Sequence, residues 1–341
     1  MQDDKDKGAP SPELFFDGVR AFHTTAALKA AVGLDLFTHI AAGAGTPEAL
    51  AEATGAAPRG LRILCDFLTV AAFVDKRDGR YQLTPSSAAF LDRRSPAYLG
   101  AIIDFLASPD MLRLFLDDPA AFVRNGGAVG SGTVGPDDGI WVKFARAMAP
   151  FMAPTARATA EILDAEDPRD LHVLDIAAGH GLYGLELALR RPGTRVTAVD
   201  WAGVLEVAAE NYRAKGIADR LQRQPGSAFE VDLGTGYDLA LLTAFLHHFD
   251  EATCVRLLEK VHAALRPGGR AAATEFVPDE GRVSPPMPAS FSFIMLATTP
   301  AGDAYTEAEL DRMFRQAGFA ATHSRKLLPS ALTLIVATKP A

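Results

Sequence analysis

The sequence predicts an α/β protein in which a doubly wound, mostly parallel sheet follows a helical N-terminal domain. Strands that alternate with helices join by right-handed crossovers into parallel sheets. Such apolar runs, with helical patterns between them, occupy residues 171–176, 195–200, 220–223, 237–243 and 270–276. Two further β-rich runs, 318–326 and 331–340, are separated only by the short turn LLPS. Strands so close in sequence pair antiparallel, so we expect the last strand to run against the others.

The composition is that of a soluble globular protein with no targeting segment. The chain has 341 residues, 48% hydrophobic and 22% charged, which is enough for two domains. Its net charge of -8 argues against nucleic acid or an anionic membrane as partner. The N-terminus lacks an apolar core, and no run reaches about eighteen apolar residues. We expect a cytoplasmic enzyme without a metal site, and Cys65 and Cys254 are expected to be buried thiols.

The N-terminal hundred residues have the order of a winged helix. Residues 13–41 carry a wide apolar helical face that something must cover. Segments 46–56 and 58–74 are helical in pattern, and 75–84 is typical of a short hairpin. DNA binding requires polar or basic side chains on the second helix, which is mostly apolar here. Five acidic and five basic residues lie between Glu48 and Arg80, so we expect this domain to pack against its copy in a dimer.

The middle of the chain is expected to bridge the two domains. Residues 97–124 have the pattern of two helices, and 125–139 form a glycine-rich stretch without the G-K-[ST] ending of a phosphate loop. We interpret that stretch as a flexible connection or lid. Residues 141–163 resume helical spacing, where Pro150 and Pro154 are expected to break or kink the helix.

The stretch DIAAGHG, from Asp175 to Gly181, forms the turn after the first strand of the sheet domain. Gly179 and Gly181 permit backbone angles that other residues resist, and the two alanines expose little more than backbone. The second strand ends on Asp200, nineteen residues after Gly181. A carboxylate at this crevice can accept both hydroxyls of a ribose, so the unit is expected to hold an adenosine.

Two adenosine cofactors fit this turn. Gly179, Gly181 and Gly184 also spell G-x-G-x-x-G, the fingerprint of dinucleotide binding. A carboxylate on Asp175 would repel a pyrophosphate but attract an ammonium or sulfonium group. We therefore favour S-adenosylmethionine over a dinucleotide.

A series of motifs resembles one known family over nearly the whole chain. LKAAVGLDLF, TPEALAEATG and GRYQLT come first, then Trp141, Phe144, Ala147 and Met148, then VDWAGV, PGSAF, FLHHFDE and RPGG. In this order they resemble the S-adenosylmethionine-dependent small-molecule O-methyltransferases, bacterial relatives of the plant caffeate enzymes. The resemblance implies a Rossmann-like class I methyltransferase domain, a winged-helix dimerisation domain and a homodimer.

The resemblance also divides the chain and assigns cofactor contacts. The expected parts are a disordered N-terminus (1–12), the dimerisation domain (13–100), a helical linker and pocket segment (101–165) and the methyltransferase domain (166–341). Asp200 matches the ribose ligand, Trp201 lies near the adenine, and Met148 lies near the reacting methyl group. The turn's two alanines stand where relatives commonly have glycine. The expected cofactor-binding residues are Asp175, Ala177, Gly179, Gly181, Asp200, Trp201, Ser227, Ala228, Phe229 and Met148.

Three residues are the catalytic candidates. His247 occupies the position of the family's catalytic histidine, and a near-neutral imidazole suits removal of a phenolic proton. Glu275 matches the acidic residue that orients it. His248 stands where the plant-type relatives usually carry aspartate, so either it also faces the acceptor or it caps the next helix or fills the core edge.

A second difference from the family pattern implies that His247 is a weaker base than in the relatives. Relatives place another supporting glutamate at the position of Ala304, and neighbouring Asp303 is the candidate substitute. A weak base suits an acidic acceptor such as a carboxylic acid, enol or activated phenol.

The acceptor pocket is expected to be lined by 277–300, although a helical core stripe would show the same apolar pattern. Met287, Phe291, Phe293, Ile294 and Met295 would supply an adaptable wall. The expected substrate-binding residues are Phe144, Met148, Phe291, Ile294 and Met295.

Two other functions remain open. A relative could methylate carbon or nitrogen, for example of an α-keto acid, with a metal held by His247, His248 and Glu275. No further histidine lies in the pocket segment, which argues against a metal. A winged-helix regulator could instead sense S-adenosylmethionine without catalysis, but its second helix is poorly suited to DNA.

Overall fold

The computed structural model describes residues 11–130 and 138–341. The expected glycine-rich connection therefore lies partly outside the described residues. Backbone proximity divides the chain into two units, Met1–Met111 and Leu112–Ala341. Each unit has its own core and is described by itself.

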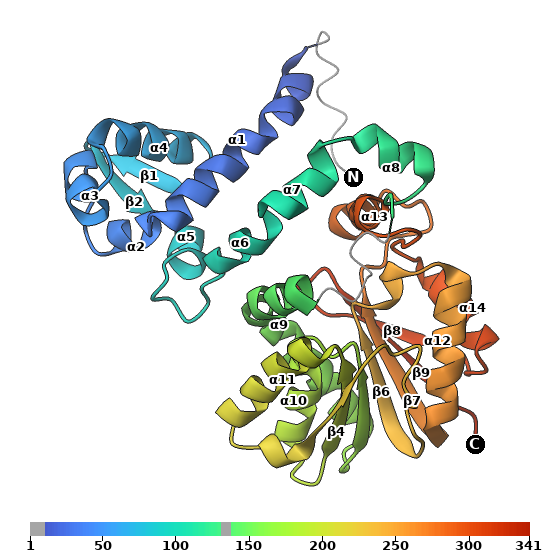
Figure 1. The fold of residues 1–341 in the computed structure, drawn as a ribbon. Helices are drawn as coiled ribbons and strands as arrows, with labels where there is room; N and C mark the ends of the chain where they lie inside the picture. Colours follow the sequence, from blue (N-terminus) through green and yellow to red (C-terminus); the bar gives the residue numbers. More distant parts are fainter. Residues whose placement is uncertain (1–10, 131–137) are drawn as a thin grey trace. The chain divides into compact units, whose positions relative to one another are not determined.

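The first unit is a small helical domain with one hairpin (Figure 1). The D-G turn at Asp78 and Gly79 has positive φ at both residues, 50° and 75°, which is the geometry of a tight antiparallel hairpin. Leu50, Leu61 and Leu68 are fully or almost fully buried beneath it. The elements are α1 (Glu13–Gly33), α2 (Leu36–Ala41), α3 (Pro47–Thr54), α4 (Pro58–Val70), β1 (Val74–Arg77), β2 (Arg80–Leu83), α5 (Pro85–Phe90), a 3₁₀ turn (Gly100–Ile102), α6 (Ile103–Leu106) and the start of α7 (Pro109–Leu116).

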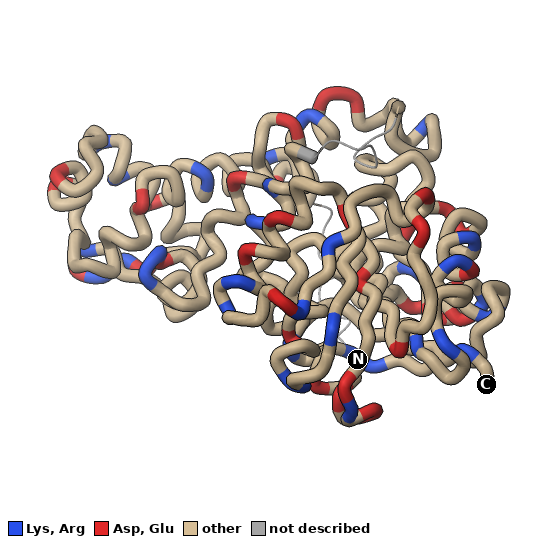
Figure 2. Tube along the Cα trace, turned by 60° about the horizontal axis from the view of Figure 1, so that its bottom comes forward, with Lys and Arg blue, Asp and Glu red and all other residues tan. Residues whose placement is uncertain are grey.

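The outer face of α1 is apolar and exposed. Leu14 is 87% exposed and Phe15 67%, and Phe16, Val19 and Phe22 are also exposed. Acidic and basic residues are interspersed along the trace of the unit (Figure 2). The α1 face is therefore an exposed apolar surface, as the sequence predicts for a helix whose apolar side needs a cover.

The second unit is the predicted mostly parallel sheet, with helices on both faces. In the described residues seven strands form one sheet in the order β5-β4-β3-β6-β7-β9-β8. β9 runs antiparallel to both neighbours, which confirms the prediction for the last strand. The strands are β3 (His172–Ile176), β4 (Arg195–Asp200), β5 (Leu221–Pro225), β6 (Tyr237–Thr243), β7 (Leu265–Glu275), β8 (His323–Lys326) and β9 (Thr333–Thr338).

Two separate apolar layers cover the sheet. Residues of α9 and α10 pack on one face, where Leu163, Leu185 and Leu187 are buried. α12 and α14 pack on the other, where Leu257 and Phe314 are buried (Figure 1). The helices are α8 (Pro119–Asn125), α9 (Asp138–Glu166), α10 (Leu182–Arg190), α11 (Ala202–Ala214), α12 (Glu251–Ala264), α13 (Pro286–Thr298) and α14 (Glu307–Gln316), with 3₁₀ turns at Ala218–Arg220 and Leu246–His248.

α9 is one helix of 29 residues, so neither Pro150 nor Pro154 breaks it. Each proline removes one backbone hydrogen bond, but the helix packs along both α10 and α11. Packing against these two helices thus outweighs the tendency of proline to interrupt a helix. One continuous helix carries residues 141–163 to the sheet.

Gly184 sets how closely α10 can approach the sheet. A Cβ atom there would lie 2.8 Å from Val196 Cγ1, 3.0 Å from Asp175 Oδ2 and 3.0 Å from the Tyr212 hydroxyl. We expect Gly184→Ala to lower the free energy of unfolding by about 1–3 kcal/mol despite alanine's better helix propensity. Gly60→Ala is the matched control, because a Cβ on that helical glycine meets nothing within 4 Å. Urea unfolding would contradict the expectation if both variants were as stable as the wild type.

Candidate active site

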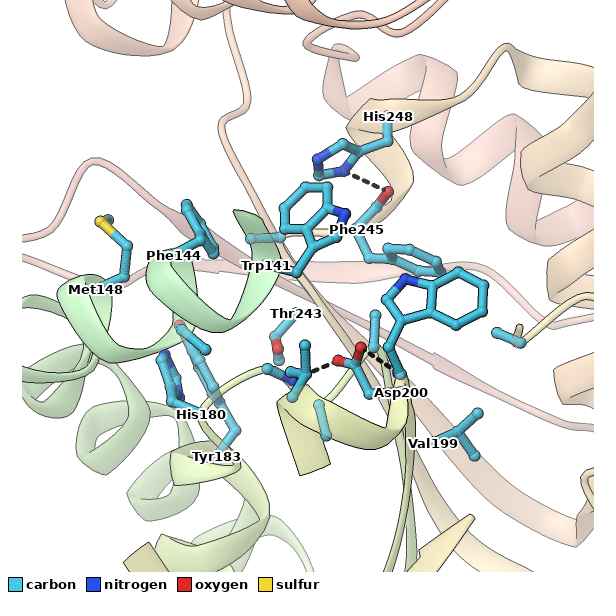
Figure 3. Close-up of a pocket in the computed structure, with 18 of the residues that line it drawn as sticks. Trp141, Phe144, Met148, His180, Tyr183, Val199, Asp200, Thr243, Phe245 and His248 are labelled. Atoms are coloured by element: carbon cyan, nitrogen blue, oxygen red, sulfur yellow. Dashed lines mark hydrogen bonds between the residues drawn. The ribbon is translucent and has the colours of Figure 1, made fainter. Parts of the chain in front are cut away.

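A pocket opens at the carboxyl ends of the central strands, where the strand order reverses (Figure 3). This is the place where open α/β sheets bind ligands. Its lining comes from α9 (Trp141, Phe144, Ala145, Met148 and Met152), the turn after β3 and the start of α10 (Ala177, Ala178, Gly179, His180 and Tyr183), β4 and α11 (Val199, Asp200, Trp201 and Val204), the segment after β5 (Gly226, Ser227, Ala228 and Phe229) and the segment after β6 (Thr243, Ala244, Phe245, His248 and Phe249).

The turn after β3 is built from left-handed residues. Ala177, Gly179 and Gly181 have φ of 51°, 57° and 69°. A Cβ on Gly179 would have Ala177 O, at 3.9 Å, as its nearest contact, so this glycine leaves room on the pocket side. A Cβ on Gly181 would instead lie 2.7 Å from that of Ala208. Gly179 is thus available to a ligand, whereas Gly181 permits α11 to pack closely and does not line the pocket.

Asp200 connects the turn to the next helix. Its Oδ2 accepts a hydrogen bond from Gly179 N at 2.8 Å, and its Oδ1 accepts one from Trp201 N at 2.7 Å. A carboxylate oxygen can accept more than one hydrogen bond. The side chain can therefore hold the turn and still receive ligand hydroxyls in the pocket.

Asp175 does not line the pocket. The residue is 1% exposed and lies beneath the turn, with its side chain toward Gly184 of α10. Burial raises the pKa of its carboxyl to about 8, because a charged group is costly away from water. At neutral pH most of this group is protonated, so it does not supply the direct charge that the sequence suggested.

The buried state of Asp175 predicts how stability depends on pH. A folded-state pKa above the unfolded one means that the folded chain binds more protons between about pH 4 and 8. Stability is therefore lost as pH rises through this range. We expect Asp175→Asn to gain stability relative to the wild type from pH 4 to 8, with a plateau above. Thermal unfolding of both proteins across this pH range tests the expectation, and Glu230→Gln, at an exposed position, is the control. A stability difference between Asp175→Asn and the wild type that does not change with pH would contradict it.

His247 and Glu275 form a buried pair beside the pocket. His247 follows β6, is 4% exposed, and its Nδ1 lies 2.5 Å from Glu275 Oε2. Glu275 Oε1 accepts hydrogen bonds from Phe245 N at 3.0 Å and Leu246 N at 2.8 Å. Since a carboxylate is an acceptor, Nδ1 of the neutral imidazole carries the proton and Nε2 presents a lone pair. Glu275 thus holds the His247 imidazole in an orientation that suits a general base.

His248 lines the pocket rather than capping a helix. Its Nδ1 donates to the Phe245 carbonyl at 3.2 Å, and its ring lies 5.7 Å from that of Trp141. Burial and the neighbouring His247 lower the pKa of His248 to about 3, so the ring is neutral. The cap of α12 is Asp250, whose Oδ1 accepts from Thr253 N at 2.7 Å. The interpretation of His248 as a helix cap is wrong, since Asp250 takes that role.

Asp303 is engaged elsewhere and is not seen to replace the second glutamate. Its Oδ2 accepts from Arg282 Nη1 at 3.0 Å, and its Oδ1 accepts from Ala304 N at 2.8 Å. The same arginine pairs with Glu309. These contacts fix the loop before α14 instead of supporting His247.

That loop nevertheless touches the histidine pair through Gly302. A Cβ on Gly302 would lie 2.2 Å from His247 O and 2.9 Å from His248 C. Gly302 N donates to Thr299 Oγ1 at 2.8 Å. The backbone of the pair therefore rests directly on the segment that follows α13.

The predicted acceptor segment divides into inner and outer residues. Phe291 meets His247 edge-on, with ring centroids 4.9 Å apart, and stacks on Phe276 at 4.1 Å. Met295 is buried in α13, whereas Phe293 is 53% exposed and Met287 46%. Phe144 and Met148 line the pocket, but Phe291, Ile294 and Met295 do not.

Some pocket residues were not singled out from the sequence. His180 and Tyr183 line the pocket from the turn after β3 and the start of α10 (Figure 3). His180 is an unusual residue within a glycine turn, and that was the available signal. Thr243 and Phe245 are placed by the end of β6, which sequence patterns locate only approximately.

Three comparisons with known proteins identify relatives. Family models match an O-methyltransferase domain at residues 129–320 and an O-methyltransferase dimerisation domain at 16–93. A 3-hydroxy-5-methyl-1-naphthoate 3-O-methyltransferase from Streptomyces sahachiroi is 29% identical over 90% of this chain and 89% of its own.

Solved structures agree over the full length. A presumed O-methyltransferase from Nostoc punctiforme is 46% identical with a TM-score of 0.94, covering 97% of this chain and 100% of its own. Human N-acetylserotonin methyltransferase, solved with S-adenosylmethionine, has a TM-score of 0.82 at 23% identity, with 100% coverage of both chains. The latter likeness concerns the fold.

Proposed function

The chain belongs to the O-methyltransferase family and is thus an S-adenosylmethionine-dependent enzyme; from this premise we propose that it methylates an oxygen of a small apolar or aromatic molecule, with His247 as general base. The observation that carries the proposal is the buried His247–Glu275 pair beside the pocket at the switch point of the sheet. The acceptor oxygen would belong to a phenol, enol or acid.

The residues present fit S-adenosylmethionine. Asp200 offers carboxylate oxygens to a ribose, Gly179 leaves space above the turn, and Trp201 and Phe229 offer aromatic surfaces for the adenine. Ser227 and Ala228 line the same end, and Met148 lines the pocket from α9. We propose these residues as the cofactor contacts, with Ala177 at the turn.

The reaction follows from the position of the base. When bound, S-adenosylmethionine would supply the methyl group as an electrophilic carbon, whose bond to sulfur breaks as the acceptor oxygen attacks, so that S-adenosylhomocysteine leaves. His247 Nε2 accepts the hydroxyl proton of the acceptor, and Glu275 holds the imidazolium that results. Phe291 and the apolar lining exclude water and keep the acceptor close to the donor, which is where much of the rate enhancement of such a displacement arises.

We infer that His248 contacts the acceptor or the donor without serving as the main base. It lines the pocket, but no carboxylate orients it in the described contacts. The substrate-binding assignments of Phe144, Met148, Phe291, Ile294 and Met295 remain proposals for the segment around the base. With one supporting carboxylate instead of two, His247 should favour acidic acceptors.

We also propose a homodimer through the N-terminal unit. The dimerisation-domain match covers residues 16–93, and α1 exposes Leu14 at 87% and Phe15 at 67%. Equilibrium sedimentation of the wild type and of Phe15→Ser/Phe22→Ser tests this. A monomeric wild type would contradict the proposal.

No observation favours the metal-assisted alternative. Within 11–130 and 138–341, no group of three or more His, Cys, Asp or Glu side chains is placed to hold a metal ion. Over the same residues, no helix combines the length and apolar character that a membrane span requires.

The deciding experiment combines binding and turnover. Calorimetry is expected to show micromolar-range binding of S-adenosylhomocysteine (about -8 kcal/mol) and little binding of NADH. Transfer of labelled methyl from S-adenosylmethionine should then be screened over phenols, enols and carboxylic acids. NADH binding without S-adenosylhomocysteine binding would refute the cofactor assignment, and labelling only at carbon or nitrogen would refute the proposed acceptor atom.

A further inference from the structure

Among the described residues, the pocket lining offers no cation to an anionic ligand group. Neither Lys nor Arg is among its described lining residues, and Asp200 contributes a carboxylate. S-adenosylmethionine carries a carboxylate on its amino-acid part. A carboxylate enclosed in a pocket needs N–H or O–H donors if no cation faces it.

The position of Asp200 indicates where that carboxylate lies. The ribose is the middle of the cofactor, so its adenine and its amino-acid part extend in different directions from Asp200. Trp201 and Phe229 line the pocket and offer aromatic surfaces for the adenine. Figure 3 shows His180 and Tyr183 on the opposite side of Asp200 from Val199. The amino-acid part is therefore expected beside His180.

The hydrogen bonds of His180 define which nitrogen donates. Leu182 N–H donates to His180 Nδ1 at 3.2 Å, so Nδ1 is an acceptor and the neutral ring carries its proton on Nε2. Asn211 Nδ2 donates to the His180 carbonyl at 2.8 Å, which fixes the backbone of the residue. The ring is thus held at one end and offers an N–H at the other.

The ring is also held neutral and oriented. His180 is 7% exposed, and burial lowers its pKa to about 4, so this tautomer persists at neutral pH. Its plane is nearly parallel to that of Tyr183, at an angle of 15° with centroids 6.1 Å apart. An N–H donor suits a carboxylate, which only accepts, and does not suit an ammonium, which only donates.

We propose that His180 is a cofactor-positioning residue, whose Nε2–H donates a hydrogen bond to the carboxylate of S-adenosylmethionine. The proposal rests on the proposed function, since it assumes that cofactor. It assigns to the residue between Gly179 and Gly181 the role that a Lys or Arg could fill in a more polar pocket. His180 acts through binding and takes no part in proton transfer.

A ligand pair that differs only in the carboxylate tests the assignment. S-adenosylhomocysteine has it, and decarboxylated S-adenosylhomocysteine keeps the adenosine, the thioether and the ammonium. His180→Asn is the informative variant, because asparagine can still accept from Leu182 N–H but does not reach as far as Nε2. Calorimetry of both ligands on both proteins forms a closed cycle.

The expected outcome is specific to one ligand. His180→Asn should bind S-adenosylhomocysteine roughly tenfold to a hundredfold more weakly, as for loss of a hydrogen bond to a charged group. Its affinity for the decarboxylated ligand and its melting temperature should match the wild type. Tyr183→Phe tests the neighbouring hydroxyl as the competing donor. Exposed His172→Asn, outside this pocket, is the control that should bind both ligands as the wild type does.

Other outcomes separate the two proposals. If His180→Asn weakens both ligands equally, or neither, or if only Tyr183→Phe loses affinity for the carboxylate, the role of His180 is refuted while the cofactor stands. If wild-type protein binds neither ligand, the proposed function itself fails.

Discussion

Replacing His247 with alanine is expected to lower kcat for methyl transfer by about 10²- to 10⁴-fold, the contribution of a positioned general base. The imidazole is the group that the structure orients through Glu275, by a contact of 2.5 Å at Nδ1. Because His247 does not line the cofactor pocket, the affinity for S-adenosylhomocysteine should stay within a factor of about two. Single-turnover kinetics and calorimetry measure the two quantities separately.

Two further variants make the result interpretable. His172→Ala removes an exposed histidine at the start of β3 and should retain full activity. His248→Asn should reduce activity less than His247→Ala. If His247→Ala were fully active and His248→Asn inactive, the base would be His248 and our assignment would be reversed.

The second large loss of kcat is expected for a substitution of Gly302, which does not line the pocket. Gly302→Ala must displace either the loop or the histidine pair, because its Cβ would lie 2.2 Å from His247 O. A misplacement of about 1 Å in a catalytic group can lower the rate about a hundredfold, and we expect a loss of that size in kcat. Cofactor affinity should be unchanged.

Gly281→Ala is the matched control in the same connection between β7 and α14. A Cβ at Gly281 meets nothing within 4 Å, so wild-type activity is expected. Equal kcat values for Gly302→Ala and the wild type would show that the loop yields freely and does not position the base. A parallel loss of S-adenosylhomocysteine binding would show that the damage is general.

The sequence predicted the arrangement of the sheet because periodicity and loop length constrain it strongly. The short link between the last two strands forces antiparallel pairing, and the structure shows it for β8 and β9. The positions of Asp200 and His247 at strand ends follow from the same reasoning. These residues lie where parallel strands must place them.

The predictions that failed concern residues whose surroundings are set by tertiary packing. Asp175 belongs to a strand whose alternation turns its side chain toward α10, so its charge could not be placed from sequence alone. Pro150 and Pro154 were predicted to break or kink the helix, and a break is wrong, because α9 packs against two helices and is continuous. The role of His248 depended on whether Asp250 already capped the next helix.

The two left-handed alanines of the pocket have a consequence for how such enzymes diversify. Ala177 and Ala244 have φ of 51° and 53° and line the pocket at the ends of neighbouring strands. Left-handed geometry costs alanine about 1–2 kcal/mol, and glycine's greater freedom in the unfolded chain costs roughly 0.5–1 kcal/mol. The two costs partly offset each other, so exchange between the residues changes stability by at most about 1.5 kcal/mol in favour of glycine while it removes or adds a methyl group at the pocket. Ligand range can drift at these positions without a compensating mutation elsewhere.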